Sequence, residues 1–123
     1  MKMILIRRLQ SFACALQGLA FLLRTQPNAR LHLLAAVLVC AAGGYFGLSR
    51  GEWLWITAAI VLVWSAEAFN TALEYLADAL HPKQHPGIGR AKDVAAAAVL
   101  IAAFGAAVIG MLVFVPHLLI QGQ

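Results

Sequence analysis

The sequence predicts an all-α integral membrane protein with one amphipathic surface helix and three transmembrane helices. Of its 123 residues, 63% are hydrophobic and only 11% are charged, whereas a soluble domain has about 45–50% apolar and about 25% charged residues. A chain of this length could not bury so much apolar surface in a water-soluble fold. Three long apolar runs are also present, each close to the roughly 20 residues that a helix needs to cross a bilayer.

The first element, residues 1–24, has the pattern of a helix that lies in the membrane interface. Apolar residues recur at spacings of three or four and form one helical stripe, which consists of Leu5, Leu9, Phe12, Leu16, Leu19 and Leu23. Lys2, Arg7 and Arg24 lie on the opposite arc, which is typical of an interfacial helix, although Arg8 interrupts the pattern. A cleaved signal peptide is the weaker alternative, because two glutamines interrupt the apolar stretch.

The three predicted spans are residues 31–48, 53–80 and 90–116. The first is interrupted only by His32, and the third has no charge between residues 94 and 115. Backbone polar groups in lipid must be satisfied within the segment, so we expect all three spans to be helical. We expect residues 1–123 to form a single membrane-embedded domain.

Basic residues predict the orientation of these spans. Five precede the first span and three lie between the second and third, whereas the C-terminal tail has none. The positive-inside rule therefore places the N-terminus and the second loop in the cytoplasm. The net charge of +4 is explained by this topology and by attraction to anionic lipids, so no nucleic-acid partner is expected.

The second span ends in an unusual polar stretch, SAEAFNTALEYLAD, at residues 65–78. Helical periodicity places its polar residues within about one third of the helix circumference, at Glu67, Asn70, Thr71, Glu74 and Asp78. Glu74 and Asp78 have an alternative explanation, since they could emerge at the interface and be solvated. Glu67 lies roughly 10 Å deeper than Glu74, where a charge costs about 2.5–3.5 kcal/mol or more. This helix face is therefore a predicted site.

Phosphoryl transfer is the chemistry that these residue types favour. Carboxylates and an amide suit Mg2+ bound partly through substrate phosphates. The following loop, HPKQHPGIGRAKD, supplies Arg90 and Lys92 beside a helix start, where they could neutralise phosphate charge. Both residues are explained equally well as determinants of topology. The predicted orientation puts this end of the span on the side where ATP is available.

The motifs E-A-F-N-T-A-L-E, Asp78 and G-R-A-K-D-V-A-A-A-A-V-L resemble the signature of the bacterial diacylglycerol kinase family, which includes undecaprenol kinases. The match extends upstream through SFACALQGLAFLLRTQPNARLHLLAA and covers roughly residues 7–115. The chain contains no GxxxxGK[ST] motif of soluble kinases. The resemblance implies a homotrimeric bundle in the bacterial inner membrane, with Mg2+ as cofactor and active sites shared between neighbouring protomers at the cytoplasmic interface.

The resemblance also implies roles for individual residues. Glu67 matches the general base, Asn70 its polar neighbour and Glu74 a metal ligand. The residues that match the nucleotide-binding region are Asp78, His85, Lys92 and Asp93. Arg7, Arg30 and Tyr45, together with Glu67, match positions near the lipid or its phosphate.

One departure from the family pattern concerns the metal. The family usually has a glutamate two residues before N-A-R, where this chain has Gln26. An amide oxygen can coordinate Mg2+ but brings no charge, so we expect weaker metal affinity if Gln26 is a ligand. We interpret His32 as a polar packing or site-wall residue.

The predicted function is ATP-dependent phosphorylation of a membrane lipid, either diacylglycerol to phosphatidic acid or undecaprenol to undecaprenyl phosphate. The segments N-A-R-L-H-L-L and Y-F-G-L-S-R-G-E-W-L are more similar to undecaprenol kinases, but the acceptor stays open. A small proton-coupled transporter or ion-conducting oligomer is the alternative, with Glu67 and Glu74 as a relay. The basic loop favours the kinase, since a proton relay needs no phosphate-binding residues.

Overall fold

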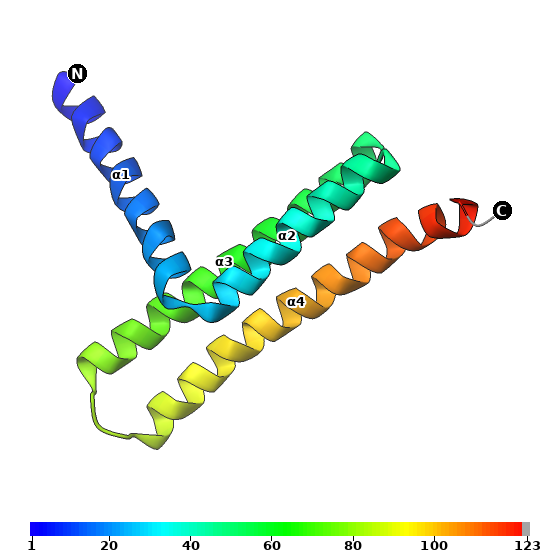
Figure 1. Cartoon of the computed structure of the whole chain (residues 1–123). Coiled ribbons are helices and arrows are strands. Elements are labelled where there is room, and N and C mark those ends of the chain that lie inside the picture. Colours follow the sequence, from blue (N-terminus) through cyan, green and yellow to red (C-terminus); the bar gives the residue numbers. More distant parts are fainter. Residues whose placement is uncertain (122–123) are drawn as a thin grey trace.

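The computed structural model describes residues 1–121 and consists of four helices: α1 (Lys2–Thr25), α2 (Pro27–Phe46), α3 (Arg50–Leu80) and α4 (Pro86–Gln121). Helix α3 packs against both α2 and α4, and α1 leaves this group of three at a steep angle (Figure 1). Helices α2, α3 and α4 are long and apolar enough to cross a membrane. The predicted all-α fold, with three candidate spans and an N-terminal helix, is confirmed.

Helix α2 is displaced toward the N-terminus relative to the predicted span, residues 31–48. It begins at Pro27, whose fixed φ angle suits the first turn of a helix. It ends at Phe46 because Gly47 adopts a left-handed conformation, with φ of 67°, and directs the chain out of the helix. Helix α1 likewise runs one residue past the predicted 1–24, to Thr25.

Helix α3 begins at Arg50 rather than at the predicted residue 53, because Ser49 and Glu52 form a capping box. The Ser49 N–H donates to Glu52 Oε2 (2.7 Å), and the Glu52 N–H donates to Ser49 Oγ (3.3 Å). These two bonds satisfy backbone N–H groups that otherwise lack partners at a helix start. The helix ends at Leu80, as the sequence predicts.

Helix α4 extends past the predicted span, residues 90–116, at both ends. At its start the Gly87 N–H donates to Nδ1 of the His85 ring (3.0 Å), so the imidazole takes the place of a conventional capping side chain. Pro116 lies inside the helix and does not end it, and α4 continues to Gln121. Proline is tolerated in membrane helices where neighbouring groups satisfy the freed backbone carbonyl.

The end of the bundle at the α2–α3 loop holds a cluster of buried apolar residues. Leu48, Ile56 and Val113 are buried there. Beside them, His117 Nε2 on α4 lies 2.8 Å from Glu52 Oε1 on α3. This polar contact and the cluster together fix the C-terminal half of α4 against the start of α3.

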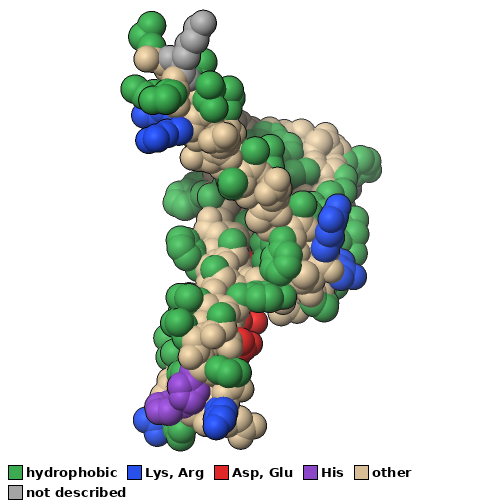
Figure 2. All heavy atoms as spheres, turned by 90° about the vertical axis from the view of Figure 1, so that its left-hand side faces the viewer, with side chains coloured by type: hydrophobic (Ala, Val, Ile, Leu, Met, Phe, Trp, Pro, Cys, Tyr) green, Lys and Arg blue, Asp and Glu red, His purple; other side chains and the backbone are tan. Residues whose placement is uncertain are grey.

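Most other apolar side chains of α2 and α4 are exposed. Figure 2 shows such side chains over much of one face of the molecule, while histidine side chains and some of the basic ones lie at the end opposite the N-terminus of α1. Exposed apolar surface of this extent is expected of a chain that contacts lipid or further copies of itself.

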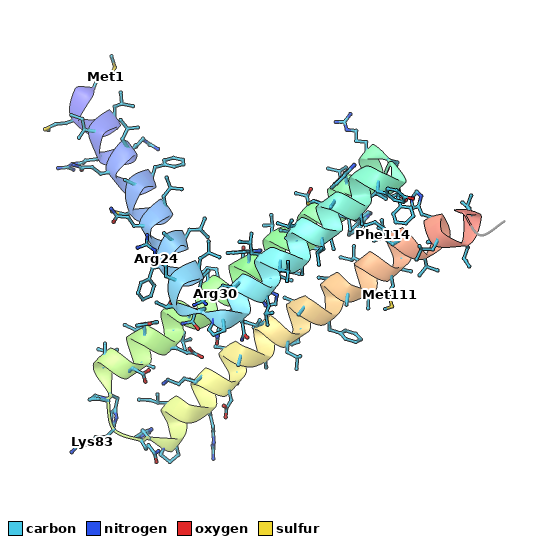
Figure 3. The ribbon with its side chains drawn as sticks, in the orientation of Figure 1. Met1, Arg24, Arg30, Lys83, Met111 and Phe114 are labelled. Atoms are coloured by element: carbon cyan, nitrogen blue, oxygen red, sulfur yellow. The ribbon has the colours of Figure 1, made fainter. Side chains whose placement is uncertain are left out.

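The elbow between α1 and α2 is held by Arg30 (Figure 3). Its guanidinium donates to the carbonyls of Leu23 (Nε, 3.0 Å) and Arg24 (Nη2, 2.9 Å), which lie in the last turn of α1. Just before the elbow, α1 contacts α3 through the edge-to-face pair Phe21–Tyr75, whose ring centroids are 5.1 Å apart. The predicted apolar stripe of α1 is mostly exposed farther from the elbow.

Candidate active site

Glu67 is the most deeply buried polar residue of the chain that the structure describes, with a side chain only 2% exposed. It lies on the face of α3 toward α2, and Thr71, one turn later on the same face, is 4% exposed. A cavity of about 280 Å³ borders this face. Its lining comes from three helices: Asn28, Leu31 and His32 of α2, Glu67 and Asn70 of α3, and Ala96, Val99, Leu100 and Ala103 of α4.

Three polar atoms at this face are buried without a hydrogen-bond partner: Glu67 Oε2, Asn70 Oδ1 and Thr71 Oγ1. Buried polar groups almost always have a partner, and an isolated carboxylate is especially costly to bury. His32 Nε2 lies 3.9 Å from Glu67 Oε2, which is beyond hydrogen-bond distance. The unpaired atoms therefore favour a polar ligand in this region.

Asn70 lies between Glu67 and the next carboxylate along the helix. Its amide Nδ2 donates to Glu74 Oε1 (3.4 Å), while its Oδ1 is unpaired. Glu74 is half-buried, and Asp78, one turn farther on, is exposed. The face thus changes from buried to exposed toward the α3–α4 turn, which is the gradient that the sequence predicts.

The α3–α4 turn forms a second, more polar cavity of about 560 Å³. Lys92 of α4 makes an ion pair with Asp78 of α3 across it. His85 also lines this cavity, and because its Nδ1 accepts the Gly87 N–H, the ring proton belongs on Nε2. An amine and an imidazole N–H are thereby presented beside the start of α4, where the helix dipole favours anions.

The structure brings together only some of the predicted site residues. Glu67, Asn70 and Glu74 lie on one face, and Asp78, His85 and Lys92 line the turn cavity. Tyr45 does not join them: it is 78% exposed and lies 13 residues beyond His32 on α2, a distance of about 20 Å. Asp93 is exposed on α4.

The remaining predicted residues lie at or beyond the elbow. The Arg30 guanidinium is occupied by the carbonyls of α1, and Arg7 is exposed on the part of α1 that leaves the bundle (Figure 1). Gln26 stands between α1 and α2, as the C-cap of one and the N-cap of the other. Within residues 1–121, no three His, Cys, Asp or Glu side chains form a group able to hold a metal ion.

Magnesium nevertheless fits the donors that are present. Mg2+ is usually bound through one or two carboxylates together with substrate phosphates and waters, and all-protein cages are unusual. The Glu74 carboxylate and the unpaired Asn70 Oδ1 are hard oxygen donors on one helix face, where such a shared ion would bind.

The sequence did not identify the partners in two polar contacts between helices, although it placed His32 at a site wall, where it lies. His32 faces Glu67 from α2, and His117 faces Glu52 from α4. The only signal was a single histidine within each otherwise apolar stretch. The capping box at residues 49–52 had a clearer signal, since Ser-x-x-Glu before an apolar run is typical of a helix start.

Fold and site together define a membrane protein with three candidate spans, a buried carboxylate whose Oε2 is unpaired, and a separate basic cavity at the α3–α4 turn. Known proteins identify the family. The model of the prokaryotic diacylglycerol kinase family matches residues 13–114. The chain therefore belongs to the prokaryotic diacylglycerol kinase family, and it is a lipid kinase.

Individual relatives agree with this assignment. An undecaprenol kinase of Bacillus subtilis (strain 168) is 39% identical over 112 residues, which cover 91% of both chains. A diacylglycerol kinase of Synechocystis sp. is 34% identical over 112 residues, or 90% of this chain and 64% of that protein. A diacylglycerol kinase of Haemophilus influenzae is 28% identical over 88 residues, or 72% of this chain and 75% of that protein. The resemblance found in the sequence motifs is confirmed.

Proposed function

We propose that this chain transfers the γ-phosphoryl group of ATP to the hydroxyl of undecaprenol, with Mg2+ as cofactor and Glu67 as general base. The observation that carries the proposal is the buried Oε2 of Glu67, which has no hydrogen-bond partner. Glu67 lines a cavity between α2, α3 and α4, and its helix is long and apolar enough to span a membrane. A lipid hydroxyl can reach this depth, and it is the group that requires a base.

The reaction begins with the acceptor hydroxyl beside Glu67. Glu67 Oε2 accepts the hydroxyl proton while the lipid oxygen attacks the γ-phosphorus. The new P–O bond forms as the bond to the β-phosphate oxygen breaks, and ADP leaves with that electron pair. Ala96, Val99 and Leu100 of α4 line the same cavity, and their apolar side chains reduce access of water, which would otherwise compete as acceptor.

The donor binds from the aqueous end. Lys92 Nζ and His85 Nε2–H are positioned to donate to phosphate oxygens at the start of α4, with Asp78 holding Lys92 in place. Asp93 is assigned to the same region. Mg2+, when bound, offsets the negative charge of the transferred group, and Glu74, Asn70 and Gln26 are the residues that would hold it. Residues 67 and 78 are separated by about 16 Å along α3, so an extended donor is required to connect the two cavities.

The working assembly in this proposal is a homotrimer with shared sites in the bacterial inner membrane, with the N-terminus and the turn cavity cytoplasmic. Helix α1 leaves its own bundle (Figure 1), so Arg7 is available to a neighbouring protomer. The exposed apolar faces of α2 and α4 supply surface for contacts between copies. The proposal keeps the assignment of Arg7, Arg30 and Tyr45 to the lipid or its phosphate. Because Tyr45 lies far from Glu67, it would contact only the hydrocarbon chain of the lipid.

Undecaprenol is preferred as acceptor because the Bacillus subtilis relative, whose name specifies it, matches over 91% of both chains. Diacylglycerol is the second candidate, since two relatives carry that name. The test uses purified protein in mixed micelles with γ-labelled ATP and either lipid at equal mole fraction. Faster labelling of undecaprenol supports the proposal. If only diacylglycerol is labelled, diacylglycerol replaces undecaprenol as the proposed acceptor. If neither lipid is labelled, the proposed function is wrong.

A further inference from the structure

Glu67 has to lose a proton once in every catalytic cycle. After it accepts the proton of the lipid hydroxyl, it must return to the carboxylate before the next acceptor binds. Its side chain is only 2% exposed, and the α4 wall of its cavity is apolar. Direct release to bulk water is therefore hindered by the same burial that protects the reaction.

His32 is the other titratable residue that lines the Glu67 cavity. Its Nε2 lies 3.9 Å from Glu67 Oε2, and that oxygen has no hydrogen-bond partner. A small rotation of either side chain would bring the two atoms within hydrogen-bond distance. The His32 side chain is 21% exposed, so it connects a buried carboxylate to the surface of α2.

We propose that His32 accepts the proton from Glu67 and so restores the base after each turnover. This inference rests on the proposed role of Glu67. The O–H bond of protonated Glu67 breaks and an N–H bond forms at His32 Nε2, which leaves a carboxylate and an imidazolium. The imidazolium then loses its Nδ1 proton to water, which restores a neutral ring with the proton on Nε2. Exchange of the ring proton through water, or a flip of the ring, returns an unprotonated nitrogen to face Glu67 before the next turnover.

Few other charges face this pair. From α3, Glu74 is the next carboxylate after Glu67, separated from it by Asn70. From α4, the cavity lining is entirely apolar. On α2, Arg30 is close in sequence, but its guanidinium is bound to the carbonyls of Leu23 and Arg24. The Glu67 carboxylate is thus the group placed to stabilise a charged His32.

The test replaces His32 and measures lipid phosphorylation in micelles at saturating ATP and lipid. His32→Gln keeps a polar side chain of similar length but cannot accept a proton. We expect it to lower kcat about 10-fold or more, to leave KM for ATP unchanged, and to flatten the pH dependence of kcat. His32→Ala should show the same loss, and added imidazole should restore activity in a saturable way because the missing ring leaves space beside the cavity.

A matched control exists in the same chain. His117 also faces a glutamate, with Nε2 at 2.8 Å from Glu52 Oε1, but at the other end of the bundle. His117→Ala should keep the parent kcat and show no response to imidazole. A thermal-unfolding measurement on each variant separates loss of fold from loss of activity.

The outcomes distinguish this inference from the proposed function. Parent-like kcat in His32→Gln overturns it, and so does a loss in folded His32→Ala that imidazole does not restore. Glu67→Gln is assayed in parallel. If Glu67→Gln is inactive while His32→Gln is parent-like, only the role of His32 is wrong. If Glu67→Gln keeps its turnover, the base assignment fails and the inference fails with it.

Discussion

Replacing Glu67 with glutamine removes the proposed base with little change in shape. The amide has nearly the same volume as the carboxylate, and a side chain that is 2% exposed in the folded chain has no room to turn toward solvent. Removing a buried carboxylate also removes the cost of its desolvation, so we expect Glu67→Gln to fold at least as stably as the parent. Any loss of activity is then attributable to chemistry.

The expected loss follows from the role of the residue. General base catalysis contributes about 10²–10⁴ to the rate, which corresponds to about 2.7–5.5 kcal/mol of activation free energy. Asp78, which is ion-paired with Lys92 of α4, lies about 16 Å away from Glu67 along α3. We therefore expect kcat to fall by at least 100-fold while the affinity for ATP stays within about 2-fold of the parent, as for a group that acts mainly in the transition state.

The assay is transfer of labelled phosphate to undecaprenol in mixed micelles, with ATP binding measured separately on the same preparation. Glu52→Gln is the matched control, since it makes the same substitution at the opposite end of α3. It should keep the parent kcat. A folded Glu67→Gln protein with kcat within a few-fold of the parent would refute the assignment of the base.

Three further predictions concern the metal and the packing of α2. Glu74→Gln should raise the Mg2+ concentration needed for half-maximal activity, because it removes the main charged protein donor. Gln26→Glu should lower that concentration near neutral pH, and the gain should shrink toward acid pH as protons compete for the added carboxylate. Gly43→Ala should destabilise the fold by about 1–3 kcal/mol relative to Gly44→Ala, because its new Cβ would lie 2.7 Å from Trp53 Cη2.

Each of these three predictions can be tested against a control. Magnesium titrations at two pH values, with saturating lipid, test the first two. An unchanged requirement would place Glu74, or Gln26, outside the metal shell. Gly44 has no atom within 4 Å of an added Cβ, so Gly44→Ala carries the same gain in helix propensity without the contact. Equal unfolding temperatures for the two glycine variants would show that Trp53 moves aside freely.

The number and order of the helices were predictable because hydropathy marks the three candidate spans and apolar periodicity marks α1. Their ends were not, because local capping sets them. Gly47 ends α2 through a positive φ angle, and the His85 ring caps α4 through a contact that has no common sequence signal. The largest error, at the C-terminal end of α4, occurred where a proline was tolerated inside the helix. The starts of α2 and α4 were each placed too late by the same margin, because Pro27 begins one helix and an imidazole replaces a standard cap in the other.

The site was predictable along one helix and much less so between helices. Glu67, Asn70 and Glu74 share a face through helical periodicity, which is a property of α3 alone. The approach of His32 to Glu67 depends on how α2 and α3 pack, and one sequence carries no information about that distance. Tyr45 is an example of the opposite error. Its position in the motif predicted that it lies near the lipid site, but the length of α2 separates it from Glu67.

The depth of Glu67 in α3 determines which concentration of each substrate governs the reaction rate. Leu80 ends α3 about 20 Å beyond Glu67, so in the proposed reaction ATP arrives from water while the acceptor stays in the bilayer. The concentration that governs acceptor binding is therefore a number of molecules per unit area of membrane. Adding inert phospholipid should slow the reaction at fixed total acceptor, whereas adding buffer should affect only the dependence on ATP. Membrane growth alone would then lower the rate per enzyme when the acceptor is subsaturating.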